Sequence, residues 1–309
     1  MTKQKELYQS FCEQHAVPLF HQLEWWDALT SSWDVAVARL DEHLCFFPYS
    51  LEQRLGFKLI RNPHLTPYSG FLFSEQTPHP IQQQLAIQVA STLPAFDYFN
   101  VDLSPELGSM SWPLPFNQAI KRTTILPLAD KSPDDLFRQF KSSLQRQIRK
   151  AEKAGLVVDN ELKIEEFLTV HEQSFQRQGK QPDIPKQYFY QLAELLKKKN
   201  CGELLMARDA EAQIHAALIR VWDTTTAYYL SGGTSESGLH SGAMSYLMWK
   251  AIQRSREQGL NQFDFEGSME AGIHRFFRNF GGDEVFYVSL HKTNSTLFQL
   301  AQKLKSFTK

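Results

Sequence analysis

The chain has 309 residues, 42% of them hydrophobic, which is long enough and apolar enough for two domains with real cores. Its formal net charge of -1 and its pI near 6.8 exclude long-range attraction to nucleic acid or anionic lipid by the average field of the protein. The cysteines Cys12, Cys45 and Cys201 are odd in number and far apart, and no CxxC or histidine cluster has metal-ligand spacing. Since no stretch is long and apolar enough for a membrane span or a signal peptide, we expect a reduced, cytoplasmic protein.

Hydrophobic periodicity in the first half predicts two helices, a group of strands, one further helix and one further strand. The expected helices cover residues 5–15, 23–31 and 81–93, and the expected strands cover 35–40, 43–50, 56–60 and 96–103. Pro113 and Pro115 then interrupt any helix or central strand. We therefore expect the domain junction close to residue 120.

The second half begins with a basic amphipathic helix. Ser132 caps it, and the helix is expected to run to Ala154, where Gly155 ends it. Its apolar stripe is formed by Leu136, Phe140, Leu144 and Ile148. The remaining face carries the cations Arg138, Lys141, Arg146, Arg149, Lys150 and Lys153.

The rest of the chain repeats the coarse order of the first half: helices, a strand meander, a helix and a strand. The expected helices cover 165–178, 186–199, 243–257, 273–280 and 296–305, and the expected strands cover 203–207, 214–222, 226–230, 262–265 and 285–290. This repeated order favours a duplicated fold that has diverged, although accidental similarity of order remains an alternative.

Four strings in the second half carry a resemblance to a known family. They are FRQFKSSLQRQIRKAEKAGLVV, AYYLSGGTSE, AMSYLMWKAIQRSREQGLNQFDFEGS and GIHRFFRNFGG. In this order and spacing, over residues 120–290, they resemble the FemABX peptidoglycan aminoacyltransferases and their wider acetyltransferase-like (GNAT) relatives. In the first half, only FHQLEWWDAL and PYSG resemble that family.

The resemblance implies an α+β (mixed α/β) protein with two tandem GNAT-like domains, each a central mixed sheet flanked by helices. The implied domains are 1–120, 121–292 with the active site, and a C-terminal helix over 293–309 that packs back on the first domain. The implied activity is transfer of an acyl or aminoacyl group to an amine, without metal and without a tightly bound cofactor. The implied donor is acyl-CoA or aminoacyl-tRNA, and the acceptor is a small molecule or a peptidoglycan precursor.

The glycine-rich segment after the strand 226–230 is the leading candidate for binding the donor, because glycines let backbone N–H groups approach a phosphate or a carbonyl. The candidate residues are Tyr229, Ser231, Gly232, Gly233, Gly238, Ser241 and Gly242. The alternative is a flexible surface connection. The acetyltransferase pyrophosphate motif Q/R-x-x-G-x-G/A is not cleanly present, which speaks against coenzyme A.

Asp264, Glu266 and His274 are the candidate catalytic residues. The two carboxylates alternate with phenylalanines, so both should face one side of a strand and handle the proton of an amine. The alternatives are a cap or an ion pair for the carboxylates and a structural role for His274.

The string GIHRFFRNFGG departs from the family pattern, because Phe277 stands where the family usually has lysine. Arg275 and Arg278 flank that position and are candidates for binding an anionic substrate. In the first half, Tyr68 and Gly70 of the PYSG string are candidates for lining a substrate groove.

The basic helix suggests one further partner, since Arg and Lys side chains contact tRNA phosphates irrespective of sequence. A solvated charged face is the alternative. Two other function classes also stay open: a binding or scaffold protein that kept the fold and lost catalysis, and a nucleic-acid-associated protein that uses this face.

Overall fold

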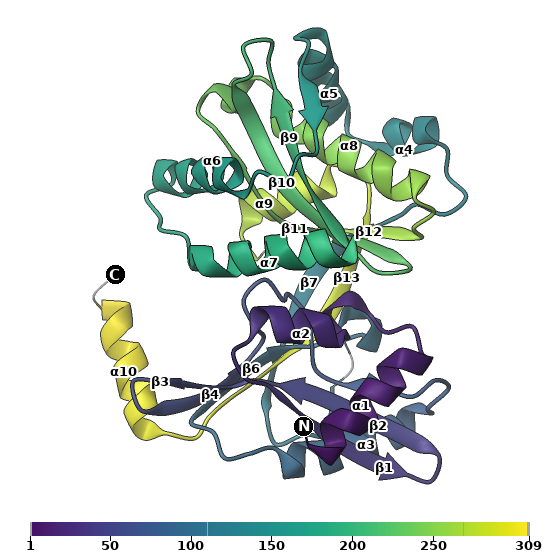
Figure 1. Ribbon diagram of the computed structural model, residues 1–309, viewed down its shortest axis with the longest axis vertical. Coiled ribbons are helices and arrows are strands. Elements are labelled where there is room, and N and C mark those ends of the chain that lie inside the picture. Colours follow the sequence, from purple (N-terminus) through teal and green to yellow (C-terminus); the bar gives the residue numbers. More distant parts are fainter. Residues whose placement is uncertain (1, 110, 268, 308–309) are drawn as a thin grey trace. The chain divides into compact units, whose positions relative to one another are not determined.

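The computed structural model describes residues 2–109, 111–267 and 269–307. The chain divides into two compact units: unit 1 is Met1–Lys121 with Phe286–Lys309, and unit 2 is Arg122–Val285. It passes between them along two strands, β7 (Asn117–Pro127) and β13 (Asp283–Thr293) (Figure 1). Strand β7 was not expected from the sequence, and the junction expected near residue 120 lies inside it. The second domain was expected to end at residue 292, whereas β13 from Phe286 onward is part of unit 1.

Unit 1 contains two groups of paired strands and the helices packed on them. Besides its parts of β7 and β13, its elements are α1 (Lys3–Gln14), α2 (Leu23–Leu29), β1 (Asp34–Leu40), β2 (His43–Tyr49), β3 (Leu51–Arg54), β4 (Phe57–Arg61), β5 (Leu72–Phe73), α3 (His79–Thr92), β6 (Tyr98–Asp102), α10 (Thr296–Phe307) and short 3-10 helices at Leu19–His21 and Pro105–Leu107. Strands β1, β2 and β5 form one sheet, and β3, β4, β6 and β13 are neighbours in another.

The returning C-terminal segment is built into unit 1 by pairing and by ring contacts. Strand β13 pairs antiparallel with β6, and its fully buried Val288 and Leu290 join the core of this unit. On α10, the ring of Phe298 lies 5.1 Å from the rings of both Phe57 and Tyr98. The last helix therefore packs on the strands of unit 1.

Unit 2 is one sheet with helices on both faces. Its elements, besides its parts of β7 and β13, are α4 (Pro133–Gln139), α5 (Ser142–Lys153), β8 (Val157–Asp159), α6 (Ile164–Arg177), α7 (Lys186–Lys199), β9 (Gly202–Arg208), β10 (Ile214–Trp222), β11 (Thr226–Thr234), a 3-10 helix at Ser237–His240, α8 (Ala243–Glu257), β12 (Gln262–Asp264) and α9 (Ala271–Arg278). The strand order is β7-β12-β11-β10-β9-β8. Only the pair β11 and β12 is parallel; the other pairs in this order are antiparallel.

The period-two alternation of a strand distributes the core of unit 2 over both faces of the sheet. Leu218 of β10 is buried in a cluster with Ile148 of α5 and Ile252 of α8. Its neighbour Ala217 pairs with Gly233 of β11, and at Gly233 an added Cβ would meet His171 of α6 at 2.9 Å. Helices α5 and α8 thus cover one face and α6 the other (Figure 1).

The expected basic helix is two helices rather than one. Phe140 (φ -66, ψ 145) ends α4 in an extended conformation, and the N–H of Lys141 donates to the carbonyl of Asn279. The side chain of Gln145 donates to the carbonyls of Phe137 and Phe140, which satisfies the end of α4. The break lets Phe140 reach the rings of Trp249 and Phe280, so tertiary packing outweighs the continuous helical pattern. All four stripe residues are buried, as expected.

Candidate functional site

The sheet of unit 2 opens between its two parallel strands. Strand β11 continues to Thr234, whereas the sequence predicted an end at residue 230, and it pairs with β12 only from Thr226 to Tyr228. The pairing with β10 on its other edge skips Leu230, which forms a β-bulge at the point of divergence. Among the described residues, the β12 side of 229–234 therefore presents peptide groups without a partner strand. Such an edge accepts an extended ligand that offers amide groups.

Asp264 closes β12 and fixes the turn that follows. Its Oδ1 accepts a hydrogen bond of 2.5 Å from the hydroxyl of Thr123 on β7 and one of 2.8 Å from the backbone N–H of Glu266. Asp264 is buried, and its neighbours Phe263 and Phe265 point into the core on the other face. The carboxylate acts as the local cap that was weighed as an alternative.

Glu266 lies beyond the strand, and this corrects the expectation of two carboxylates alternating on one strand. Its backbone has a φ of 55°, in the left-handed region. The residue is half-buried, and its Oε1 is buried without a hydrogen-bond partner in the described part of the chain. Burial, and secondly the charge of Asp264, raise the pKa of Glu266 well above its ordinary value.

Tyr229 stands opposite, at the start of the open stretch of β11. The centre of its ring lies 5.6 Å from that of Phe277. A Cβ added at Gly232 would come within 2.6 Å of the Tyr229 hydroxyl oxygen, so this hydroxyl fills the space beside the glycine. Burial, followed by the charge of Glu266, raises the pKa of the Tyr229 hydroxyl. At neutral pH this hydroxyl keeps its proton and can donate it, while Glu266 holds its proton more strongly than an ordinary glutamate.

His274 belongs to a separate cluster around Glu284, which the sequence did not single out. Its Nε2 lies 2.9 Å from Oε2 of Glu284. The same oxygen lies 3.5 Å from Nη1 of Arg122 and 3.7 Å from Nη1 of Arg278. Thus two predicted residues, His274 and Arg278, meet at one carboxylate, which holds the imidazole in a fixed orientation. Arg275, which follows His274 on α9, is exposed and is not part of this cluster in the described chain.

A cavity of about 470 Å³ lies at the start of α8. Two cations line it: Nζ of Lys150 on α5 donates to the carbonyl of His240 at 2.6 Å, and Nη1 of Arg177 on α6 donates to the carbonyl of Thr234 at 2.9 Å. Other lining residues are Gln147, Gly238, Leu239, His240, Gly242, Ala243, Met244, Ser245 and Phe276. The N-terminus of a 15-residue helix together with two cations makes an environment suited to phosphate.

The glycines expected to cradle a ligand are required by packing within the chain. A Cβ on Gly238 would come within 1.9 Å of the carbonyl oxygen of His215, and one on Gly242, whose φ is +77°, within 2.3 Å of the carbonyl oxygen of Gln147. Gly232 and Gly233 lie inside β11 rather than in a loop, beside Tyr229 and α6. Of the candidate glycines in this segment, Gly238 and Gly242 line the cavity. Close packing within the chain explains why the segment is rich in glycine.

The two candidate serines of this segment have different places, and Ser241 is the one that stabilises the connection between β11 and α8. Ser231 is a half-buried residue of β11. The hydroxyl of Ser241 donates to the carbonyl of Gly238 at 2.9 Å and accepts from the N–H of Ala243 at 3.2 Å. The segment 235–242 is therefore held by internal hydrogen bonds and is not a flexible connection.

Phe277, at the position of the family lysine, is a core residue. It is 5% exposed and contacts the rings of Tyr229 and Phe265. A lysine here would bury its ammonium group among aromatic rings, so the core of this chain does not suit the family residue.

Tyr68 and Gly70 lie in unit 1, while every other predicted site residue lies in unit 2. Tyr68 is buried, with its ring against those of Phe20 and Tyr287. Gly70 has a φ of +98°, and a Cβ there would be 2.4 Å from Cδ2 of Leu103. Both residues have a clear packing role in the core of that unit.

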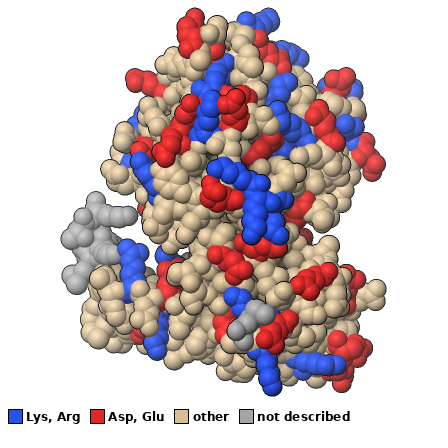
Figure 2. Space-filling view, viewed as in Figure 1, with Lys and Arg blue, Asp and Glu red and all other residues tan. Residues whose placement is uncertain are grey.

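The cations proposed to contact tRNA are all exposed. Arg138 pairs with Asp135 at 2.7 Å, and Arg149 lies over the ring of Phe137. Lys150 is the member that lines the cavity, so it belongs to the site as well as to the basic face. Over the face of the molecule that Figure 2 shows, acidic and basic side chains are interspersed.

Sequence reasoning missed Thr123, Arg177 and Glu284 as parts of the site. Thr123 is on the unexpected strand β7, and Arg177 is an ordinary last-turn cation of α6. Glu284 follows the glycine pair that ends the fourth family-like string. In the described chain, no group of three or more His, Cys, Asp or Glu residues is arranged to hold a metal ion, and none of the described helices is long and apolar enough to cross a membrane.

Comparison with known proteins gives a consistent result. Residues 138–278 match a family model described as an acetyltransferase (GNAT) domain. The structure of FemX superposes with a TM-score of 0.66 at 15% identity, covering 97% of this chain and 98% of that one. L-PGS from Bacillus licheniformis gives a TM-score of 0.55 at 13% identity, covering 94% and 93%. A tandem GNAT protein from the clavulanic acid biosynthesis pathway gives 0.53 at 10% identity, covering 94% of each chain.

No curated protein matches the sequence. At these identities the superpositions establish the fold, and they confirm the expected mixed α/β architecture of two tandem GNAT-like domains. The family model confirms the acetyltransferase-like (GNAT) part of the resemblance, since it covers two of the four strings in full and the other two in large part.

Proposed function

We propose that this chain, which matches a GNAT acetyltransferase domain over residues 138–278 and has a tandem GNAT-like fold, is an acyltransferase that moves an acyl or aminoacyl group from a phosphate-bearing donor to an amine. One observation carries this proposal: β11 and β12 diverge after three paired residues, and Tyr229 and Glu266 stand at that divergence. The acyl carbonyl is proposed to bind in the opening between the strands, and the two side chains are proposed to accept and donate the protons of the reaction.

The proposed reaction is direct attack of the amine on the activated carbonyl. The carboxylate of Glu266 takes the proton that the attacking nitrogen loses. Backbone N–H groups on the open edge of β11 stabilise the negative oxygen of the tetrahedral intermediate. As the carbon–sulfur or carbon–oxygen bond breaks, the hydroxyl of Tyr229 gives its proton to the leaving group. Asp264 acts as a positioning residue, since it holds the turn that carries Glu266.

The donor's phosphates are assigned to the cavity at the start of α8. Lys150 donates one N–H to the carbonyl of His240, and Arg177 donates to the carbonyl of Thr234 and to the hydroxyl of Ser174. Both side chains have further N–H groups to offer an anion. Acyl-CoA satisfies this chemistry with its diphosphate. Aminoacyl-tRNA satisfies it with its terminal phosphates, and in that case the exposed cations of α5, Arg146, Arg149 and Lys153, would follow the RNA backbone.

The acceptor is proposed to be an amine of a small molecule or of a peptidoglycan precursor, as the FemABX resemblance implies. His274, held by Glu284, and the exposed Arg275 are assigned to the acceptor side as hydrogen-bond donors. Tyr68 and Gly70 stay proposals for acceptor binding, with their packing role in unit 1 established independently of that.

The experiment that tests this function measures transfer from radiolabelled acetyl-CoA and from radiolabelled aminoacyl-tRNA to a panel of amines that includes a UDP-linked muropeptide. We expect turnover with one donor class. In the double variant Lys150→Gln/Arg177→Gln, KM for that donor should rise at least tenfold while kcat changes little.

For a coenzyme A donor the matched control is Lys153→Gln, because Lys153 is on the same helix as Lys150 but does not line the cavity. For an aminoacyl-tRNA donor, whose backbone Lys153 would contact, the control is Lys198→Gln, a change at an exposed cation of α7 outside the cavity. Ligand-induced stabilisation without turnover for every donor and acceptor would favour the non-catalytic scaffold. Transfer that the double variant and the control lose equally would place the donor elsewhere, on the general basic face.

A further inference from the structure

A second cavity of about 450 Å³ lies in unit 2, away from the residues assigned to acyl transfer. It is lined by Asn160, Leu162, Leu196, Lys197, Asn200, Gly202, Glu203, Leu204, Trp222, Arg254 and Gln258. None of these lines the cavity at the start of α8. The two cavities use opposite ends of the same helix, because Arg254 is in the last turn of α8 and Gln258 follows it.

One wall of this cavity is an ion cluster with more positive than negative charge. Glu203 is 12% exposed, and its Oε1 lies 2.6 Å from Nη2 of the fully buried Arg220. Its Oε2 accepts a hydrogen bond of 3.1 Å from Nη1 of Arg254. One carboxylate thus serves two guanidinium groups. Glu257, whose charge also acts on Arg220, is exposed.

Arg220 is held in place and cannot leave the cluster. Its Nη1 donates to Oγ of Ser255 at 2.7 Å, and its guanidinium carbon lies 4.5 Å from the centre of the Trp222 ring. Its Nε is buried without a hydrogen-bond partner in the described chain. Burial lowers the pKa of Arg220, which reflects the cost of keeping this charge out of water. Buried ion clusters of this kind contribute little net stability compared with apolar side chains.

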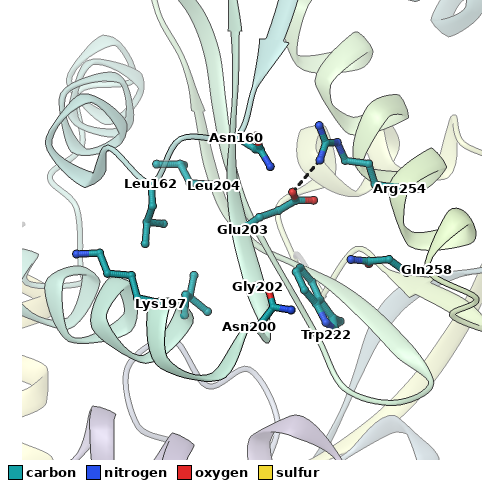
Figure 3. Close-up of a pocket in the computed structure, with 11 residues that line it drawn as sticks. Asn160, Leu162, Lys197, Asn200, Gly202, Glu203, Leu204, Trp222, Arg254 and Gln258 are labelled. Carbon is teal, nitrogen blue, oxygen red and sulfur yellow. Dashed lines mark hydrogen bonds and ion pairs between the residues drawn. The ribbon is translucent and has the colours of Figure 1, made fainter.

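The rest of the wall offers neutral hydrogen-bond donors and an aromatic surface. Figure 3 shows the side chains of Asn160, Glu203, Arg254 and Gln258 around one space, with Trp222 at its edge and Lys197 turned away. Lys197 pairs instead with Glu194 at 2.7 Å. In the described chain, the amides of Asn160, Asn200 and Gln258 make no side-chain hydrogen bond, so they are available to a ligand.

From this arrangement we propose that the cavity binds a small organic anion, a carboxylate or a phosphate ester. Its anionic group pairs with the outer edge of Arg254, which is 37% exposed, and so supplies the negative charge that the cluster lacks. The amides of Asn160, Asn200 and Gln258 bind its polar groups, and Trp222 packs against its carbon skeleton. A cation is disfavoured, because both oxygens of Glu203 already face guanidinium groups.

The test is a titration of the full-length protein with citrate, inorganic phosphate and glucose 6-phosphate at constant ionic strength, followed by thermal shift and by tryptophan fluorescence. At least one probe should raise the melting temperature saturably, since a ligand of the native state stabilises it. Citrate alone identifies a carboxylate site, and glucose 6-phosphate alone identifies a phosphate-ester site. Trp222→Phe should remove the fluorescence change and keep the thermal shift.

Arg254→Gln should weaken binding of the active probe at least tenfold. Lys198→Gln, with the same charge change on an exposed residue outside the cavity lining, should leave binding unchanged. Because Arg254→Gln also removes one of the two guanidinium partners of Glu203, Asn160→Ala and Gln258→Ala are the complementary variants. Each should weaken binding severalfold with the ion cluster intact.

The double variant Lys150→Gln/Arg177→Gln should respond like the wild type, which separates this site from the proposed donor cavity. Absence of saturable stabilisation with all three probes overturns the proposal. Equal losses in Arg254→Gln and Lys198→Gln overturn it as well, because they indicate general charge attraction.

Discussion

The backbone N–H of Glu266 donates a hydrogen bond of 2.8 Å to Oδ1 of Asp264. This bond holds Glu266 in a left-handed backbone conformation and keeps its side chain near a second carboxylate, which raises its pKa. This one short turn thus accounts both for the position of the proposed general base and for part of the rise in its pKa.

Glu266→Gln should reduce kcat about 100-fold or more, because the amide keeps the shape of the side chain but cannot take a proton from the attacking amine. The measurement is steady-state transfer with the active donor, alongside circular dichroism to verify folding. Glu257→Gln, an exposed change of the same type, should retain full activity. Retained activity in Glu266→Gln would remove this residue from the mechanism.

The same substitution should stabilise the protein at neutral pH. The pKa of Glu266 is raised on folding above its ordinary value of 4.5, so above that pH the unfolded state releases a proton that the folded state keeps, and stability falls as pH rises. Wild type and Glu266→Gln should therefore have similar unfolding free energies below pH 4.5 and diverge above it, with the variant more stable. Urea denaturation across this pH range measures the difference; a constant offset would contradict the assignment.

Tyr229→Phe should lower kcat roughly 10- to 100-fold with little change in melting temperature, since the ring contact with Phe277 stays and only the proton donor is lost. The adjacent Tyr228→Phe is a matched control with the opposite pattern. The hydroxyl of Tyr228 donates to Asp223 at 3.0 Å, so its removal should cost about 1 kcal/mol of stability and leave kcat unchanged.

Gly242→Ala should destabilise unit 2 by more than Gly259→Ala. Both glycines have left-handed backbones, with φ values of +77° and +78°, but a Cβ at Gly259 meets nothing within 4 Å, whereas one at Gly242 would lie 2.3 Å from the carbonyl oxygen of Gln147. The backbone term alone costs about 1–2 kcal/mol, and Gly242→Ala adds the displacement of α5. Urea denaturation of the two variants measures the loss of unfolding free energy in each. Equal losses would show that α5 moves aside at little energetic cost.

Phe277→Lys, which restores the family residue, should not raise activity and should lower stability. It deletes a buried ring, at a cost of about 3–5 kcal/mol for large-to-small changes in cores, and adds a desolvated ammonium group. Ile273→Lys, one turn earlier on α9 and 41% exposed, should be nearly neutral. A gain in transfer rate with Phe277→Lys would mean that the surrounding core still accommodates a catalytic lysine.

Hydrophobic periodicity predicted the helices and strands in which apolar residues recur regularly along the element itself. Helices α7 and α8 and strand β10 have the expected bounds, 186–199, 243–257 and 214–222. Strand β7 was missed, because NQAIKRTTILP carries no clean alternation and its buried Thr123 and Thr124 are polar. The division of the basic helix at Phe140 depends on partners more than 100 residues later in the chain, Trp249 and Phe280.

The site was predictable in its parts and not in its arrangement. The sequence drew attention to Asp264, Glu266, His274 and the glycine segment, but it could not show that Glu266 lies past the strand end or that Glu284 holds His274. Nor could the sequence distinguish a glycine that makes room for a ligand from one that makes room for another strand or helix, because both requirements select the same residue.

The passage of the chain from unit 1 into unit 2 and back has a consequence for the order of folding during synthesis. Unit 2 is one continuous stretch, Arg122–Val285, whereas unit 1 is completed only by Phe286–Lys309. Until β13 is made, the core of unit 1 lacks Val288 and Leu290, and β6 lacks its antiparallel partner. On the ribosome the later unit is therefore expected to become stable first, which reverses the usual N-terminal-first order of multidomain chains.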